Sequence, residues 1–436
     1  MADSIATDRQ KDQLEYMQRW LRYAPTPPVR GSNSYDVFIS YRSLDRAWAM
    51  ALFDVLKLAG WKAFLDQYDL IPGSELETSL AEALEASSSG VILWSSRHKD
   101  SEWCKKERLA MSKLKSRAFK YIFAKLDAEP LPLFAAADLY VDFEDSPEGP
   151  RGVRLLDLLC GMKGVERAPE AVVLAQEVDQ NAKTTMVAVK GAIEAGNATR
   201  LVEIGTSAQP GVLASPGPVL AVAQGLIRMG ECELARTVLV HARAHFPESI
   251  RAKQLEGLAL RRLERYQEAV DVLSELKAAG HQDPETMGML AAAWDGLYLG
   301  SKKKLHLRTS RELYRTAFER DPQNYYTGIN AAAKSLFLSE TEEANRLVAQ
   351  VLALPTLAKD VAADDLYGGC TQAEGYLLQR KLDAAAAQYE KMIDKHPTKK
   401  GDLQGTGRQA ARICAALDLS SEETAKVLAP FKLLDD

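Results

Sequence analysis

Hydrophobic residues follow two different patterns along this chain, and the change falls near residues 160–170. Before that point, short runs of β-branched and aromatic residues alternate with segments in which apolar residues recur at helical spacing. After it, almost every apolar position fits a helix. The pattern predicts an α/β domain followed by an all-α region.

The first half alternates strands with helices. Residues 35–41 (YDVFISY) are almost continuously apolar, as in a strand buried on both faces of a parallel sheet. Four more strands are expected at 61–65, 90–94, 121–126 and 139–143, and helices at 44–59, 102–115, 153–159 and from Ser74 onward. Alternation of this length predicts a five-stranded parallel sheet with helices on both faces.

The second half repeats itself every 34 residues: Ala235 matches Ala269, and Leu239 matches Leu273. Small residues at fixed offsets of this period are the tetratricopeptide (TPR) signature, because the two helices of each unit cross closely. Repeats are expected at 216–249, 250–283, 284–323, 324–357 and 366–399, with the basic insert 301–308 stretching the turn inside the third. Such repeats stack into an α-solenoid whose concave face binds a protein or peptide.

Four segments are therefore expected: an N-terminal helix and proline-rich linker (1–33), the α/β domain (34–162), a helical connector (163–215) and the TPR-like α-solenoid (216–436). The first helix, at 8–23, ends before three prolines. We favour packing of this helix on its own domain, with an intersubunit contact as the alternative.

Composition narrows the choice of function. Lys and Arg total 55 against 60 Asp and Glu, a net charge of −5, so we do not expect a nucleic-acid binder and interpret the basic run 302–304 as solvated. The five cysteines are far apart, which favours a reducing compartment. The N-terminus carries charges where a secretion signal needs an apolar stretch, and the longest uncharged run, 204–227, contains prolines that disfavour a membrane helix. We expect a cytoplasmic protein.

Common catalytic patterns are missing from the sequence. It has no GxxxxGK[ST] phosphate loop, no GxGxxG after a strand, no HExxH and no GxSxG. We therefore expect no resident metal or cofactor.

One cluster of polar residues in the α/β half can form a site. Glu107 lies one helical turn after Trp103, so both share a helix face. Residues 40–43 and 66–73 follow the first two strands, whose carboxyl ends meet at one edge of a parallel sheet. A carboxylate, an aromatic ring, an arginine and hydroxyls suit a substrate with ribose, phosphates and a flat ring. Core packing of Trp103, and a surface position for Arg42, are the alternatives.

Four short motifs follow one another along the α/β half of the chain and together resemble a known domain family: DVFISY, SLDR, YDLIPGSEL and SEWCKKE. Together they resemble a Toll/interleukin receptor (TIR) domain over Ser34–Leu159, and the Trp103-Cys104…Glu107 arrangement is similar to the plant and bacterial branches. The resemblance implies a flavodoxin-like fold. It also implies cleavage of NAD+ at the nicotinamide–ribose bond, giving nicotinamide and ADP-ribose or a cyclic ADP-ribose.

The motifs of the TIR family match individual residues of this sequence to expected roles in the site. Glu107 matches the catalytic glutamate, and the loop 66–73 matches a mobile loop that borders the substrate and partner domains. The expected substrate-binding residues are Tyr41, Arg42, Ser43, Asp66 and Trp103, and the expected gating or self-association loop is Asp69, Leu70, Ile71, Pro72 and Gly73.

A single carboxylate is chemically sufficient for this reaction. Most glycosidases need a second carboxyl group to protonate the leaving group, but nicotinamide leaves NAD+ as a neutral molecule. The carboxylate then stabilises an oxocarbenium-like transition state, an electrostatic effect worth about 3–4 kcal/mol.

The favoured hypothesis is an NAD+ glycohydrolase activated by oligomerisation through its TPR region and TIR–TIR contacts. By likeness to bacterial TIR proteins, it would act in antiphage defence signalling. The first alternative is a non-catalytic TIR–TPR adaptor, and the second is a protein that binds an ADP-ribose signal without turnover.

Overall fold

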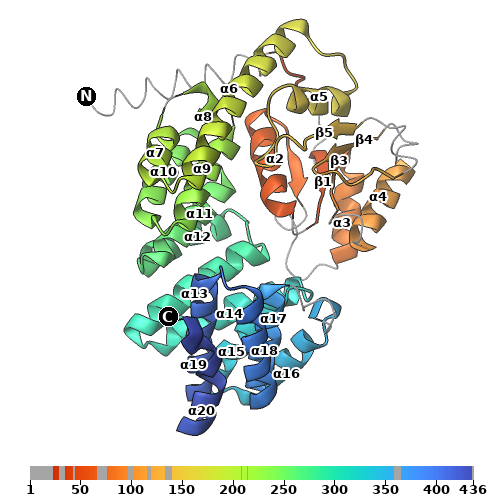
Figure 1. The fold of residues 1–436 in the computed structure, drawn as a ribbon. Helices are drawn as coiled ribbons and strands as arrows, with labels where there is room; N and C mark the ends of the chain where they lie inside the picture. Colours follow the sequence, from red (N-terminus) through yellow and green to blue (C-terminus); the bar gives the residue numbers. More distant parts are fainter. Residues whose placement is uncertain are drawn as a thin grey trace. The chain divides into compact units, whose positions relative to one another are not determined.

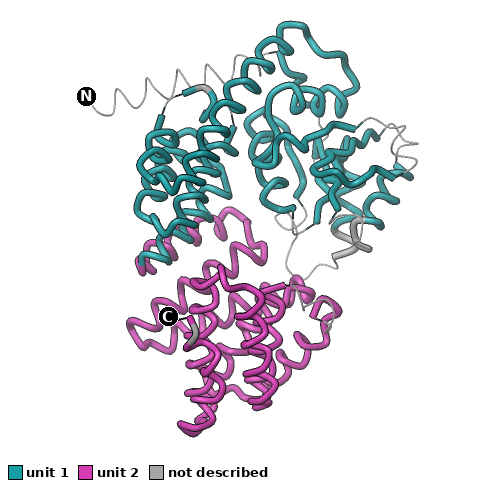
Figure 2. Tube along the Cα trace, viewed as in Figure 1, with its two compact units in different colours: residues 1–263 teal, residues 264–436 magenta. Residues whose placement is uncertain are grey.

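The computed structural model describes residues 23–28, 35–42, 45–65, 76–96, 102–114, 119–132, 140–207, 209–213, 215–357 and 365–434, excepting the side chains of 76–79, 102–104, 210 and 433. The helix expected at 8–23 lies outside these ranges except for its last residue. The chain separates into two compact units, Met1–Leu263 and Glu264–Asp436 (Figure 2). The four-segment division stays a prediction.

A parallel sheet of five strands forms the centre of the first half of unit 1 (Figure 1), which confirms the predicted α/β class. Its strand order is β2-β1-β3-β4-β5. The strands are β1 (Tyr35–Ser40), β2 (Ala63–Leu65), β3 (Ser87–Trp94), β4 (Lys120–Lys125) and β5 (Tyr140–Asp142).

Strand β3 begins earlier than the apolar pattern indicates, at Ser87 instead of Gly90. The extra residues are polar but satisfied: the Ser87 hydroxyl donates to the Ala83 carbonyl and the Ser89 hydroxyl to the Asp36 carbonyl, both at 2.7 Å. Hydropathy alone cannot find strand residues of this kind, because their burial depends on hydrogen bonds to other segments.

Four helices cover the sheet: α2 (Arg46–Leu58), α3 (Leu76–Glu85), α4 (Glu102–Leu114) and α5 (Gly152–Lys163). Phe38, Ile92 and Phe123 project from one face into a buried cluster that contains Leu84 of α3 and Met111 of α4. Helices α2 and α5 lie on the other side (Figure 1).

Unit 1 continues into helices: α6 (Pro169–Glu194), α7 (Ala198–Gly205), α8 (Pro210–Leu213), α9 (Pro216–Arg228), α10 (Cys232–His245) and α11 (Ile250–Arg262). Small residues set their crossings, because a Cβ at Gly205 would lie 2.8 Å from Val238 and one at Gly225 would lie 2.9 Å from Ile193. The helices therefore share one continuous core that includes Leu226 and Leu239.

Unit 2 is helical: α12 (Tyr266–Ala278), α13 (Pro284–Ser301), α14 (Lys304–Arg320), α15 (Tyr325–Phe337), α16 (Thr341–Leu352), η3 (Pro355–Leu357), α17 (Leu366–Leu378), α18 (Leu382–Lys395), α19 (Lys400–Ala416), α20 (Ser421–Leu428) and η4 (Ala429–Leu434). The pairs α13–α14, α15–α16 and α17–α18 coincide with three predicted repeats. Across the described ranges, no helix combines the length and apolar character that crossing a membrane requires.

The prediction of a stretched turn at 301–308 is wrong. Helix α13 continues to Ser301, Lys302 turns the chain in the left-handed region (φ 58°), and α14 begins at Lys304. The additional residues lengthen the two helices instead, since Lys and Leu are good helix formers. Periodicity detects extra residues but does not say which element absorbs them.

A charged network links three helices inside unit 2. Arg412 of α19 donates to both carboxylate oxygens of Asp295 on α13, at 2.7 and 2.9 Å, and Lys334 of α15 contacts the same carboxylate at 3.0 Å. Burial acts to raise the pKa of Asp295, but the two cations outweigh it and lower the pKa to about 2. The network holds α13, α15 and α19 in register, because breaking one partner would leave a buried charge unpaired.

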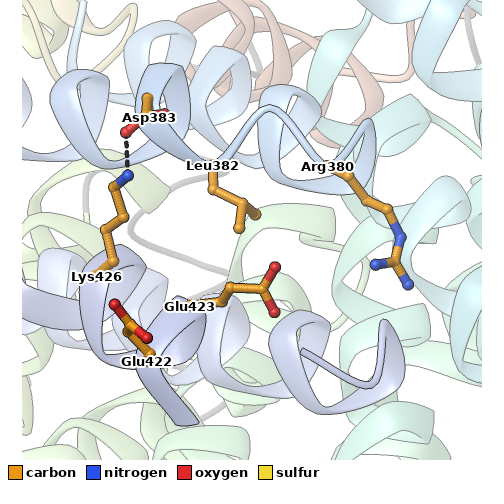
Figure 3. A pocket seen from close by; sticks show the side chains of 6 residues that line it. All are labelled: Arg380, Leu382, Asp383, Glu422, Glu423 and Lys426. Carbon is orange, nitrogen blue, oxygen red and sulfur yellow. Dashed lines mark ion pairs between the residues drawn. The ribbon is translucent and has the colours of Figure 1, made fainter. Parts of the chain in front are cut away.

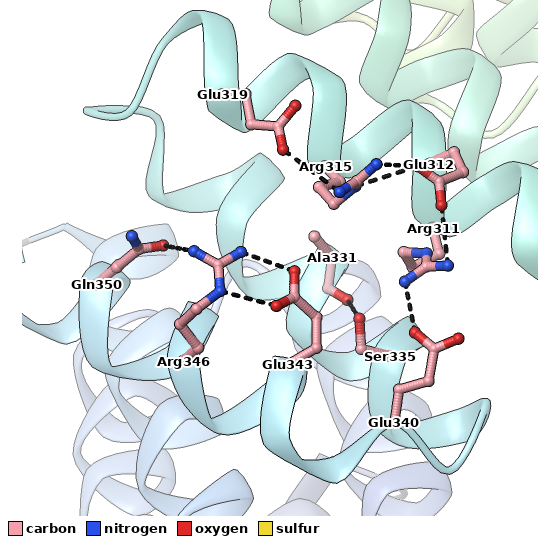
Figure 4. A network of polar contacts seen from close by, with 10 residues as sticks. All are labelled: Arg311, Glu312, Arg315, Glu319, Ala331, Ser335, Glu340, Glu343, Arg346 and Gln350. Carbon is pink, nitrogen blue, oxygen red and sulfur yellow. Dashed lines mark hydrogen bonds and ion pairs between the residues drawn. The ribbon is translucent and has the colours of Figure 1, made fainter.

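More exposed ion pairs lie on α14 and α16, one between the two helices and another within α16 (Figure 4). Arg311 of α14 pairs with Glu340, the residue that precedes α16, and Arg346 pairs with Glu343 at 2.7 Å. Exposed pairs of this kind contribute about 0–1 kcal/mol each, so they add less to stability than the apolar core.

Helix α2 of the α/β domain packs against α9 and α11, and a carboxylate is buried at this contact. Asp54 is 5% exposed, and burial raises its pKa from 3.8 to about 7. Ser249 and Ile250 at the start of α11, together with Lys57, offset the effect only in part, while Glu248 adds to it. Below about pH 7 the folded protein therefore holds a proton at this contact.

Replacing Asp54 with asparagine should stabilise unit 1 at neutral and alkaline pH. Between about pH 4 and 7 the folded state binds a proton that the unfolded chain releases, so wild-type stability falls as pH rises and levels off above 7. The shift corresponds to at most about 4 kcal/mol. Asparagine removes this dependence, which urea unfolding at several pH values would measure.

Tryptophan fluorescence suits this measurement, because five of the six tryptophans precede residue 264. The matched control is Asp145→Asn, which changes an exposed carboxylate in the same unit. Equal pH profiles for wild type and Asp54→Asn would contradict the prediction.

Candidate functional site

The predicted catalytic carboxylate lies at the carboxyl end of strand β1. The Ser40 hydroxyl, on the last residue of β1, donates to Oε2 of Glu107 on α4 at 2.5 Å. Ser40 is 1% exposed and Glu107 is 8% exposed. Glu107 is therefore held at the edge of the sheet, where ligands bind in this class of fold, and does not extend into bulk water.

Glycine at position 90 allows α4 to approach the sheet. A Cβ there would lie 2.8 Å from the Met111 sulfur and 3.1 Å from the Phe119 ring. Met111 is fully buried and lies one helical turn beyond Glu107. The packing of Met111 on β3 therefore fixes the height and rotation of the helix that carries the carboxylate.

Two further hydrogen bonds tie neighbouring segments together at the same edge. The Ser95 hydroxyl, just after β3, donates to Asp45 before α2 at 2.5 Å. The Ser96 amide donates to Asp127, after β4, at 2.9 Å. Sequence reasoning did not select Asp45 or Ser95 as site residues. Asp45 belongs to the SLDR motif, whereas the signal for Ser95 is only that it follows a predicted strand.

Other predicted site residues are described only in part. Tyr41 follows Ser40 and is buried, and the Arg42 carbonyl accepts a hydrogen bond from the Asp45 amide at 2.7 Å, which turns the chain into α2. Residues Ser43, Asp66, Asp69, Leu70, Ile71, Pro72 and Gly73, and the side chain of Trp103, lie outside the described part of the chain. Their roles stay predictions.

Chemically, the described part of the site offers a carboxylate fixed by a hydroxyl donor. Within the described ranges, no three or more His, Cys, Asp and Glu side chains are grouped to hold a metal ion. A fixed carboxylate can stabilise a developing positive charge without proton transfer.

Unit 2 has a separate polar hollow of about 350 Å³ between α18 and α20 (Figure 3). An ion pair between Lys426 and Asp383 crosses it, and Arg380 and Glu423 also line it. Charges of both signs line an open surface here, which gives no indication of a particular ligand.

Comparison with known families gives two matches. Residues 37–156 match the TIR domain family, and residues 231–338 match a family described as Tetratricopeptide Repeats-Sensor. The chain therefore carries a TIR domain followed by a TPR-like region.

Two curated plant proteins are similar to the TIR domain. A probable 2′ cyclic ADP-D-ribose synthase of Brachypodium distachyon is 35% identical over 105 residues, which are 24% of this chain and 46% of that protein. The TMV resistance protein N of Nicotiana glutinosa is 33% identical over 86 residues, which are 19% of this chain and 8% of that protein. The matches thus span less than half the length of each relative.

Among solved structures, a thermophilic TPR protein of Thermus thermophilus is 23% identical with a TM-score of 0.36, covering 46% of this chain and 97% of that one. The TIR domain of a Toll-related receptor of Hydra magnipapillata is 26% identical with a TM-score of 0.24, covering 26% of this chain and 86% of that one.

Adding a methyl group at position 90 should destabilise the TIR domain. In Gly90→Ala the new Cβ meets Met111 and Phe119, so α4 has to move away from β3, at a cost of about 1–3 kcal/mol. Urea unfolding followed by tryptophan fluorescence would measure the loss.

Gly191→Ala is the matched control for that substitution. Gly191 lies within α6 and a Cβ there has no neighbour within 4 Å, so alanine should leave stability unchanged or raise it by up to about 1 kcal/mol. Equal stability changes in the two variants would contradict close packing of α4 at Gly90.

Proposed function

We propose that this protein cleaves NAD+ at the bond between nicotinamide and ribose, with Glu107 as the catalytic residue. The observation that carries the proposal is the buried Ser40–Glu107 hydrogen bond at the carboxyl edge of a TIR-domain sheet. Similarity of this domain to a probable 2′ cyclic ADP-D-ribose synthase supports the substrate class.

In the proposed reaction the C1′–N bond breaks and its electron pair passes to the pyridinium nitrogen, so nicotinamide leaves uncharged. Ribose C1′ becomes transiently cationic, and the Glu107 carboxylate stabilises that charge. Water then adds to C1′ and releases a proton, giving ADP-ribose. Attack by a hydroxyl of the same ADP-ribose, with loss of its proton, gives a cyclic product instead. Access of water to the site decides between the two products.

The TPR-like region would control this activity by binding a protein or peptide partner and bringing TIR domains together. Similarity of residues 231–338 to a family of sensor repeats supports a regulatory role. The contact of α2 with α9 and α11 supports coupling between these helices and the catalytic site, because α2 is the next element after β1, whose carboxyl end holds Ser40. Loss of NAD+ on activation would suit a bacterial antiphage effector.

Glu107→Gln should reduce nicotinamide release from NAD+ by about a hundredfold or more, because an amide cannot stabilise the cationic ribose as a carboxylate does. Chromatography of nicotinamide and ADP-ribose products from the full-length protein measures this. The matched control, Glu82→Gln, alters an exposed glutamate of α3 and should leave the rate unchanged.

The assay should cover a range of protein concentrations, each with its oligomeric state measured. Specific activity that rises with oligomer formation supports activation by assembly. If an oligomeric wild-type preparation releases no nicotinamide, or if Glu107→Gln retains full activity, the enzymatic proposal fails. A non-catalytic TIR–TPR adaptor is then the better account.

A further inference from the structure

We infer that Ser40 is a positioning residue that orients the Glu107 carboxylate and favours its ionised form. The inference deepens the proposed function, on which its kinetic test rests. It concerns one atom pair, the Ser40 Oγ and the Glu107 Oε2, which are 2.5 Å apart.

The distance is typical of a hydroxyl that donates to a carboxylate. Charge-assisted O–H···O⁻ bonds are shorter than neutral ones, at about 2.5–2.7 Å, and are roughly twice as strong. Both residues are less than 9% exposed, so water competes little for either partner. A bond of this kind restrains a side chain that otherwise has three free torsions.

The donor belongs to the more rigid of the two elements. Ser40 lies opposite Ile92 in the parallel pairing of β1 with β3, and β1 is paired on its other side with β2. Glu107, by contrast, is carried by a helix whose position depends on side-chain packing at Gly90. The sheet therefore sets the position of the hydroxyl, and the hydroxyl sets that of the carboxylate.

A polar residue at this position departs from the pattern of the strand. Side chains two apart on a strand project to the same face, and Phe38, two residues before Ser40, lies in the buried cluster with residues of α3 and α4. Ser40 thus occupies a strand position that faces the apolar core, where an apolar side chain is expected. Burying a hydroxyl there is unfavourable unless it is hydrogen-bonded, and its partner is the proposed catalytic carboxylate.

The Ser40 hydrogen bond is expected to affect the charge of Glu107 and the rate of the chemical step. A donor to a carboxylate stabilises the charged form relative to the neutral acid. Orientation and charge matter most when ribose C1′ becomes cationic, so the bond should contribute more to the transition state than to substrate binding. Its loss should therefore lower kcat more than it raises KM.

The test compares Ser40→Ala with Ser89→Ala in the full-length protein. Ser89 is also buried in the sheet and donates one hydrogen bond at 2.7 Å, but to the Asp36 carbonyl. Both variants lose one buried hydrogen bond, so both should be less stable than wild type. Only Ser40→Ala should lower kcat, by about 10–100-fold. Its KM should change about twofold or less, and the acidic limb of its pH–rate profile should move to higher pH.

Two more substitutions of Ser40 vary the strength of the hydrogen-bond donor. Ser40→Thr keeps the hydroxyl and should restore most of the lost kcat. Ser40→Cys keeps the size but has a weak donor, and should resemble Ser40→Ala. Cysteine also serves if the alanine variant fails to fold. Equal kcat and pH profiles for the Ser40 and Ser89 variants would overturn the inference, and so would a rise in kcat on removal of the hydroxyl.

A readout independent of turnover separates this inference from the proposed function. NMR titration of the Glu107 carboxyl carbon should give a higher pKa in Ser40→Ala than in wild type, and no difference in Ser89→Ala. A shift in an oligomeric protein that does not cleave NAD+ would support Ser40 while the proposed function fails. An active enzyme whose Glu107 titrates identically in all three proteins would overturn the role of Ser40 alone.

Discussion

Close approach of α4 to the central sheet is the constraint on which the site depends. Gly90 leaves the space, Met111 and Phe119 fill it, and Glu107 then lies within hydrogen-bond distance of Ser40. Together they place a carboxylate at the edge of a parallel sheet and remove most of it from water, which strengthens its effect on any charge that develops nearby.

The TIR domain is joined to the helices that follow it by more than a peptide linker. The Val153 amide at the start of α5 donates to Asp179 of α6 at 2.9 Å, and a Cβ at Gly152 would overlap that carboxylate. Helix α2 meets α9 and α11 around the buried Asp54. Within unit 1, a change in the helical part thus has a physical route to the domain that carries Glu107, because packed elements shift together.

Unit 2 relies on a different mixture of forces. Small residues and apolar side chains pack its helix pairs, as in other TPR-like regions, while Asp295, Lys334 and Arg412 join three helices through charge. Apolar packing tolerates sliding between helices, whereas a buried ion network permits only one arrangement without leaving a charge unpaired. We infer that the network specifies the register of α13, α15 and α19.

Sequence alone determined the order of strands and helices along the chain and the repeat period, and it proposed Glu107 as the catalytic residue, since periodicity and short motifs are local properties. It misplaced the start of β3, where the Ser89 hydroxyl is satisfied by the distant Asp36 carbonyl. It also assigned residues 301–308 to a turn, because periodicity detects extra residues but not the element that absorbs them. Only the tertiary structure brought Ser40 to Glu107 and Asp45 to Ser95. Such pairs arise where strand ends meet helices, and no spacing along the chain encodes a distance across the sheet edge.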